Sequence, residues 1–180
     1  MTTKDNKEVN VNEIKKLIQL KHENIIKFIS PIINPHNPRD ISNFNCLMEL
    51  CEGFTYKGNL EDKVVTHLNK IGGSLKINEF LHFAQQILNG ISYIHSNGIA
   101  HMDIKLTNIL INKSFDIKLC DFGSAISYNE GRVTFPKITL KNQSPDFNDY
   151  IIHGDYSYLI KHDIWCAGIV FYNLLFLTVF

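Results

Sequence analysis

The stretch HMDIKLTNIL, residues 101–110, decides the fold because it mixes polar and aliphatic side chains. Its polar members include His101, Asp103, Lys105 and Asn108, and aliphatic residues separate them. A buried strand would not carry so many charged side chains, and a solvated loop would not carry so many aliphatic ones. The stretch therefore predicts a rigid polar loop between buried anchors. Taken alone, Asp103 and Asn108 indicate only a loop-stabilising polar pair.

The composition indicates one folded domain. The chain has 180 residues, of which 44% are hydrophobic, so it can bury a core and is not disordered. Its formal net charge of +0 removes any bulk electrostatic argument for a nucleic-acid partner.

The cysteines and the N-terminus indicate location. No two cysteines have CxxC spacing, which favours reduced intracellular thiols, and MTTKDNKEVN has no apolar signal-peptide core. We therefore expect an intracellular, cytoplasmic protein. The four cysteines are Cys46, Cys51, Cys120 and Cys166.

Hydrophobic periodicity predicts alternating short elements. Helices are expected over 9–21 and 77–96 and from near Asp163 onward, and strands over 24–34, 44–50, 108–112 and 117–120. Residues 124–160 show no clean period and are expected to be irregular. The face of the 77–96 helix is predicted to consist of Leu81, Ala84, Ile87, Leu88, Ile91 and Ile94, and Asn97-Gly98 to end it. These elements imply a small α/β part before a mostly helical part, with the polar loop flooring a cleft between them.

The pattern H-x-D-x-K-x-x-N is followed, thirteen residues after Asn108, by Asp121-Phe122-Gly123. This arrangement resembles the catalytic loop and DFG motif of the eukaryotic protein kinase family, of the serine/threonine type. Glu13, with His22 nine residues later and then Asn24-Ile25-Ile26, resembles helix C and the strand after it. CLMELCEG resembles the hinge, and DIWCAG resembles the start of the buried helix F. The combination of these motifs is specific for that family, although no single motif would be.

The resemblance implies an α+β, bilobal protein-kinase-like fold over 1–180. Residues 9–52 would form a partial small lobe and 53–180 a partial, mostly helical large lobe. The large lobe would lack its last helices, and the small lobe would be incomplete, so the resemblance also implies a sequence truncated at both ends.

The resemblance also implies roles for the polar residues. Asp103 would accept or orient the proton of a substrate hydroxyl, and Lys105 would neutralise charge on the transferred phosphoryl group. Asn108 and Asp121 would hold Mg²⁺ through oxygen ligands. Lys105 and Asp121 would also belong to the nucleotide-binding residues. Gly123 would allow the backbone to turn after the metal-binding aspartate.

The resemblance places the adenine of ATP against the hinge. Met48 would be the gatekeeper behind the base, and Leu110 would form its floor. The carbonyl of Glu49 and the N–H of Cys51 would bond to the adenine edge. ATP and Mg²⁺ are thus the expected cofactors, and a protein is the expected substrate.

Several of these residues also have structural interpretations. His101 is expected to be a packing residue that stacks on Phe122 and Leu17, rather than a base. Cys120 is expected to be a small buried hydrophobe rather than a reactive thiol. Glu13 by itself would be an ordinary acid on a helix surface.

The front of the chain departs from the family pattern. The family's glycine-rich loop and strand lysine lie upstream of helix C, but Lys4 and Lys7 are too close to Glu13 to supply that strand. We therefore expect Glu13 to have no lysine partner. This departure favours a second interpretation, a non-catalytic kinase-like module that binds a partner.

The activation segment departs as well. Met102 stands where most family members have arginine, and the only arginines are Arg39 and Arg132. A multi-arginine phosphate pocket cannot be built, so phosphorylation at Thr134 or Thr139 is not expected to switch on activity.

The end of the activation segment carries a weaker match. Ser144-Pro145-Asp146 could stand for the family's Ala-Pro-Glu, and Lys105 with Thr139 favours serine/threonine substrates. The apolar run 164–180 is expected to be the buried helix, with Asp163 tied to the catalytic-loop backbone. A membrane span is the less favoured alternative for this run. Nothing in the sequence indicates an oligomeric state.

Overall fold

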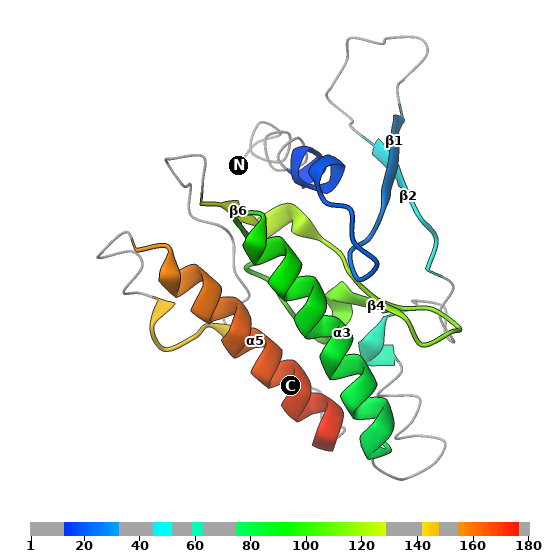
Figure 1. Cartoon of the computed structure of the whole chain (residues 1–180), viewed down its shortest axis with the longest axis vertical. Coiled ribbons are helices and arrows are strands. Elements are labelled where there is room, and N and C mark those ends of the chain that lie inside the picture. The colour runs from blue at the N-terminus through cyan, green and yellow to red at the C-terminus, as the bar shows by residue number, and fades with distance from the viewer. Residues whose placement is uncertain are drawn as a thin grey trace, which may run out of the picture.

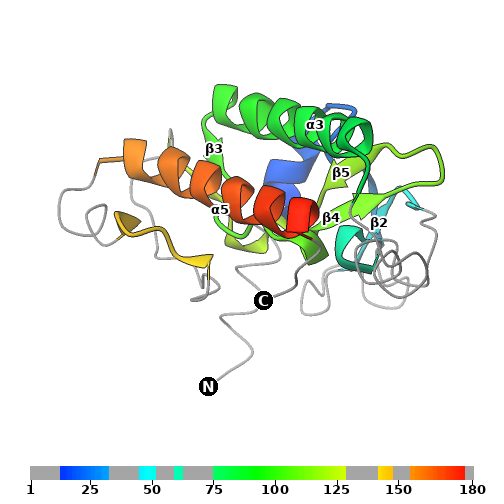
Figure 2. The same cartoon turned by 90° about the horizontal axis from the view of Figure 1, so that it is seen from below.

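The computed structural model describes six segments of the chain, which are 13–32, 45–51, 59–62, 75–128, 142–147 and 155–176. Two long helices, α3 (Ile77–Ser96) and α5 (Ser157–Phe176), run side by side in two perpendicular views (Figure 1 and Figure 2). The ribbon of β1 (Phe28–Ile32) and β2 (Asn45–Met48) extends to one side of them.

Helix α3 occupies the predicted range, and Gly98 follows its C-cap with a left-handed φ of 74°. The buried face differs from the prediction at two positions, because Leu81 is 54% and Leu88 44% exposed. Phe83 and Gly90 are buried instead, so the buried stripe lies further round the helix. The buried residues that the prediction and the structure share are Ala84, Ile87, Ile91 and Ile94.

Helix α5 begins at Ser157, earlier than the predicted start near Asp163. The additional turn before Asp163 includes the buried Leu159, which was not counted in the apolar run. The helix packs against α3, where Phe171 meets Phe80 edge to face with 6.0 Å between ring centroids.

By length and composition, α5 is also the one helix in the described part of the chain that could span a membrane. In its apolar 18-residue window, 44% of the residues are buried. The buried side chains of α5 include the charged Asp163 and the polar His162 and Asn173. This distribution and the packing on α3 favour the core-helix interpretation.

The strands form three two-stranded antiparallel ribbons among the described residues. Strand β1 pairs with β2 through an irregularity between Phe28 and Ser30. Strand β4 (Ile109–Ile111) pairs with β5 (Ile117–Leu119), close to the predicted positions. Strands β3 (Ile99–Ala100) and β6 (Ile126–Ser127) pair across the polar loop and were not predicted, because two-residue strands leave no readable period.

Two apolar clusters enclose the chain segment around residue 103. The larger cluster joins Leu17, α3, β4, β5 and α5, and it includes Ile104 and Leu106. The smaller cluster contains Met102 and Leu159. The α+β prediction is confirmed by this mixture of helices and small antiparallel sheets. The predicted division at residues 52 and 53 remains a prediction.

Candidate active site

The polar loop is anchored in both apolar clusters, as its sequence predicts. Met102 is 1% exposed in the smaller cluster, and Ile104 and Leu106 are buried in the larger one. Asp103 lies between these anchors and is itself 9% exposed. Met102 adopts a left-handed φ of 68°, which an L-residue keeps only where its surroundings require it. The anchors therefore determine the position of the Asp103 carboxylate.

Three predicted site residues meet on this loop. The Lys105 Nζ lies 2.7 Å from Oδ2 of Asp103. The Asn108 side-chain amide donates to the same Oδ2 at 3.0 Å and to the Asp103 backbone carbonyl at 2.9 Å. The side-chain nitrogen of Asn108 is hydrogen-bonded to Asp103. The side-chain oxygen of Asn108, Oδ1, is therefore the atom of this amide that remains for a cation.

Asp163 of α5 holds the start of the loop, as predicted. Its Oδ2 accepts the backbone N–H of His101 at 2.7 Å, and its Oδ1 accepts that of Met102 at 2.8 Å. The Nε2 of His95, in the last turn of α3, lies 2.8 Å from the same Oδ2. A fully buried carboxylate is stable only with such partners.

The ring of His101 connects the loop to the Asp121 segment. Its Nδ1 accepts the backbone N–H of Asp103 at 3.3 Å, which leaves Nε2 to donate to the Cys120 carbonyl at 3.0 Å. The ring centroid lies 4.7 Å from that of Phe122 with 53° between the planes, so Phe122 is the packing partner but the contact is tilted rather than stacked. Leu17 belongs to the same apolar cluster as Phe122.

The pKa of His101 reports how close the site carboxylates are. Burial lowers this pKa, while Asp163, the Cys120 carbonyl, Asp103 and Asp121 all act in the opposite direction. The net shift is downward, so the ring is neutral at pH 7 and serves as a packing residue. The charges of carboxylates from both motifs therefore act on one imidazole.

Asp121 stands at the turn between β5 and the short helix η2 (Phe122–Ser124). It adopts a left-handed φ of 63°, its side chain is exposed, and its Oδ1 accepts the Gly123 N–H at 3.4 Å. One residue earlier, the Cys120 N–H donates to the Asn108 carbonyl at 3.0 Å. This bond holds the two predicted metal ligands on adjoining segments.

The thiol of Cys120 is held in its protonated form. Its Sγ lies 3.3 Å from the Asn108 carbonyl oxygen. Burial, followed by the charge of Asp121, raises the pKa of this thiol to about 12. The structural interpretation of Cys120 is therefore favoured over a reactive one.

Glu13 faces the Asp121 segment. Burial raises the pKa of its carboxyl, and the charge of Asp121 adds to this effect. A hydrogen bond with the Phe122 backbone and the charge of Lys16 act in the opposite direction. Residues 1–12, which include both upstream lysines, lie outside the described residues. The prediction about the lysine partner therefore stays a prediction.

The predicted nucleotide contacts lie where β2 ends. Met48 is its last residue, pairs with Phe28 and is 38% exposed. Glu49 and Cys51 follow, both half-buried, and Leu110 is the half-buried central residue of β4. Strand β4 follows the loop that ends at Asn108, so Leu110 and the two predicted metal ligands belong to the β4–β5 ribbon and its ends.

The sequence analysis missed two side-chain clusters. His162 Nδ1 lies 3.1 Å from the Ser144 hydroxyl, and Cys166 Sγ lies 3.5 Å from His162 Nε2. Lys118 Nζ lies 3.0 Å from Oε1 of Glu49. The four-residue spacing of His162 and Cys166 on one helix was a readable signal, whereas nothing in the sequence links Glu49 to Lys118. Arg39, Arg132, Thr134 and Thr139 lie outside the described residues.

Comparison with known proteins shows the family of the chain. The family model described as a protein kinase domain matches residues 1–179. Mitogen-activated protein kinase 5 of Oryza sativa subsp. indica is 32% identical over 166 residues, which is 92% of this chain and 41% of that protein. Mitogen-activated protein kinase HOG1 of Exserohilum turcicum is 33% identical over 165 residues, covering 91% and 43%.

This chain covers a smaller share of a third relative. Serine/threonine-protein kinase par-4 of Caenorhabditis briggsae is 32% identical over 169 residues, covering 91% of this chain and 24% of that protein. The chain thus spans less than half the length of these relatives. The match of the family model to nearly the whole chain shows that it belongs to the protein kinase family, alongside serine/threonine kinases.

Proposed function

We propose that this chain carries the catalytic loop of a serine/threonine protein kinase that transfers the γ-phosphate of ATP to protein hydroxyls. The observation that carries the proposal is the hydrogen-bonded joining of two segments. Asp103, Lys105 and Asn108 lie on one segment, and the Asn108 carbonyl accepts the N–H of the residue before Asp121.

The proposed chemistry depends on positioning. Asp103 accepts or orients the proton of the substrate hydroxyl, and its carboxylate is held by Asn108. Lys105 is already 2.7 Å from that carboxylate, so its ammonium is placed to neutralise charge on the transferred phosphoryl group. His101 does not compete as a base, because burial lowers its pKa.

The residues fit a magnesium site completed by phosphate oxygens. Asp121 offers an exposed carboxylate and Asn108 an amide oxygen, both of which are hard ligands. No group of three His, Cys, Asp or Glu side chains in the described part of the chain could hold a metal alone. Mg²⁺ commonly takes one or two protein ligands with water and substrate phosphates. When bound, it would neutralise phosphate charge.

The adenine would lie between the hinge and β4. The carbonyl of Glu49 and the N–H of Cys51 are the proposed bonds to its edge, Met48 the gatekeeper and Leu110 the floor. Support comes from the backbone of Glu49, whose own N–H donates to the Lys27 carbonyl at 2.9 Å. That bond fixes the strand end that presents the hinge.

We further propose that activity does not require phosphorylation of the activation segment. Met102 is 1% exposed within an apolar cluster, so the family's phosphate-binding position is occupied by packing. Replacing Thr134 or Thr139 by Glu should leave phosphoryl transfer unchanged within about twofold, a difference of about 0.4 kcal/mol. A large increase in rate would contradict this part of the proposal.

Nucleotide binding and transfer test the main proposal. We expect Mg·ATP to raise the melting temperature of the wild-type chain and radiolabelled ATP to label a generic protein substrate. Asp121→Asn should abolish the Mg²⁺-dependent shift, and Asp103→Asn should abolish labelling while keeping the shift. Asp116→Asn, an exposed acid on the same β4–β5 ribbon, is the matched control.

A non-catalytic kinase-like module remains a second candidate function. Its specific support is the side chain of Glu13, which faces Asp121 and whose pKa is raised by burial and by that charge. A folded wild-type chain that shows neither a Mg·ATP shift nor labelling would overturn the enzyme proposal. The same result would favour the binding module.

A further inference from the structure

One cation joins three separate segments beside the proposed adenine position. The Lys118 Nζ lies 3.0 Å from Oε1 of Glu49 in the hinge, and it donates to the Glu23 carbonyl at 2.9 Å. The side chains of Lys118 and Glu49 are 17% and 25% exposed. Both are thus withdrawn from most of the solvent that weakens surface ion pairs.

Glu49 extends this network to Lys27, the residue before β1. Its Oε1 accepts the backbone N–H of Lys27 at 2.7 Å, while its own N–H donates to the Lys27 carbonyl at 2.9 Å. One carboxylate oxygen therefore accepts from the Lys118 ammonium of β5 and from the backbone N–H of the residue before β1. Charge-assisted bonds of this kind are stronger than neutral ones.

Lys118 also stands next to the proposed adenine floor. Leu110 and Lys118 are directly opposite each other in the β4–β5 ribbon. Opposed residues of an antiparallel pair project on the same face, and both are half-buried while their neighbours Ile109 and Leu119 are buried. Three residues after Lys118 comes Asp121. The lysine therefore contacts the hinge, lies opposite the floor residue and precedes the metal-ligand candidate by three residues.

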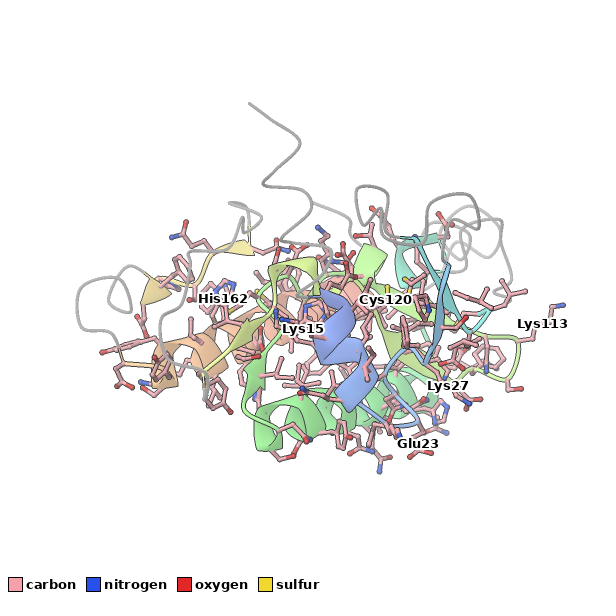
Figure 3. The ribbon with its side chains drawn as sticks, turned by 90° about the horizontal axis from the view of Figure 1, so that it is seen from above. Lys15, Glu23, Lys27, Lys113, Cys120 and His162 are labelled. Carbon is pink, nitrogen blue, oxygen red and sulfur yellow. The ribbon has the colours of Figure 1, made fainter. Side chains whose placement is uncertain are left out.

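Packing alone does not hold the hinge at this point. Glu23, Glu49 and Lys118 line both a largely apolar cavity of about 760 Å³ and a more polar cavity of about 590 Å³. Cys51 of the hinge packs against the larger apolar cluster, and the Glu49–Lys118 ion pair adds a polar contact between the hinge and β5 beside these open volumes. In Figure 3, Glu23 and Lys27 lie on the same side of the molecule, and Lys113 extends from the far tip of the ribbon.

We propose that Glu49 and Lys118 are positioning residues that hold the hinge backbone at a fixed distance from Leu110 and Asp121. Through this contact they set the affinity for the adenine nucleotide. The inference rests on the proposed nucleotide binding, but it concerns two side chains that do not themselves touch the nucleotide. Loss of the pair should weaken binding and leave the transfer step unchanged.

The test compares Lys118→Met, Glu49→Gln and the double variant with Lys113→Met, a lysine in the exposed turn of the same ribbon. The dissociation constant for Mg·ATP is measured by calorimetry on the full chain. We expect each single variant to raise it about five- to twentyfold and the double variant to add little more, because one interaction is lost. Lys113→Met should bind as wild type does.

Folding is controlled separately. Glu49→Gln keeps an acceptor for the Lys27 N–H, and the melting temperature of each variant without nucleotide identifies any that unfold. If the chain proves active, KM for ATP should rise while kcat stays constant, which a general loss of structure would not produce.

The outcomes separate the two proposals. A wild-type chain that binds no Mg·ATP overturns the proposed function and this inference together. Wild-type binding with unchanged or tighter binding in the folded single variants overturns only this inference. Additive losses in the double variant would also overturn it, because the two side chains would then act independently.

Discussion

The loop that carries Asp103, here called the reaction side, and the part formed by β1, β2 and the hinge, here called the nucleotide side, are stabilised by different contacts. The loop that carries Asp103 lies between two apolar clusters and is bonded to α5 and to the Asp121 segment. The front part leaves large apolar side chains exposed and relies on β1–β2 pairing and the Lys118 network. The exposed residues there are Ile18, Ile29, Leu47, Met48 and Leu50. We infer that burial between two clusters and hydrogen bonds together preorganise the reaction side, whereas the nucleotide side combines packing on one cluster with the polar Lys118 network.

The largest expected effect concerns the aspartate that holds the loop. Asp163→Asn removes a charged acceptor of three hydrogen bonds, and the amide keeps only one acceptor oxygen, so its NH2 group would face either the His101 or the Met102 N–H. We expect the free energy of unfolding in urea to fall by about 3–5 kcal/mol. Asp146→Asn, at an exposed carboxylate, should change it by less than about 0.5 kcal/mol. Equal losses would mean that the loop is not anchored through α5.

The next effect tests the junction of the two parts. A Cβ added at Gly90 would lie 3.0 Å from Leu119 Cδ1 and 3.2 Å from the Asn24 carbonyl oxygen. Gly90→Ala should therefore cost about 1–3 kcal/mol of unfolding free energy through overpacking. Gly168→Ala in α5 meets nothing within 4 Å and should instead stabilise by up to about 1 kcal/mol. Stabilisation by both substitutions would show that the residues facing Gly90 can shift to accommodate the added methyl group.

Acid should weaken the packed side. Burial lowers the pKa of both His101 and His162, so the unfolded chain binds more protons than the folded chain once the pH falls below about 6.5. Stability should then decrease as pH decreases, by at most about 1.4 kcal/mol per pH unit for each histidine. His162→Asn should reduce the slope of unfolding free energy between pH 7 and 5.

The smallest effect concerns the front part. The pKa of Glu13 is raised by burial and by Asp121, so its ionised form destabilises the folded chain at pH 7. Glu13→Gln should raise the melting temperature slightly at pH 7. The gain should vanish below about pH 4.5, where the carboxyl is protonated in both states. A loss of stability at pH 7 would indicate that the ionised carboxylate has a compensating partner.

Much of the fold could be predicted because hydrophobic residues recur at regular intervals within its elements. The α3 range and the β4–β5 ribbon follow from periodicity and from turn residues. The rotation of the α3 face was not readable, because Leu81 and Leu88 have the same hydrophobicity as the residues that are buried. The early start of α5 was missed because Tyr and Ser precede Leu159 and His162 and hide the apolar period.

The candidate site was predictable where backbone geometry defines it. The spacing of Asp103, Asn108 and Asp121 indicated two adjoining segments, and hydrogen bonds join them. The contacts of Lys118 and of His162 depend on which side chains meet across distant segments. No local pattern encodes such a meeting, so sequence alone missed both.

The left-handed backbone at Met102 and Asp121 has a consequence for dissection of this protein. Outside its fold, each residue would gain about 1–2 kcal/mol by returning to ordinary right-handed or extended angles. A synthetic peptide spanning 99–124 would therefore not preserve the arrangement of the two carboxylates. The conformation of this short loop depends on the surrounding helices as much as on its own amino-acid sequence. Grafting the loop onto another protein would therefore require grafting those helices as well.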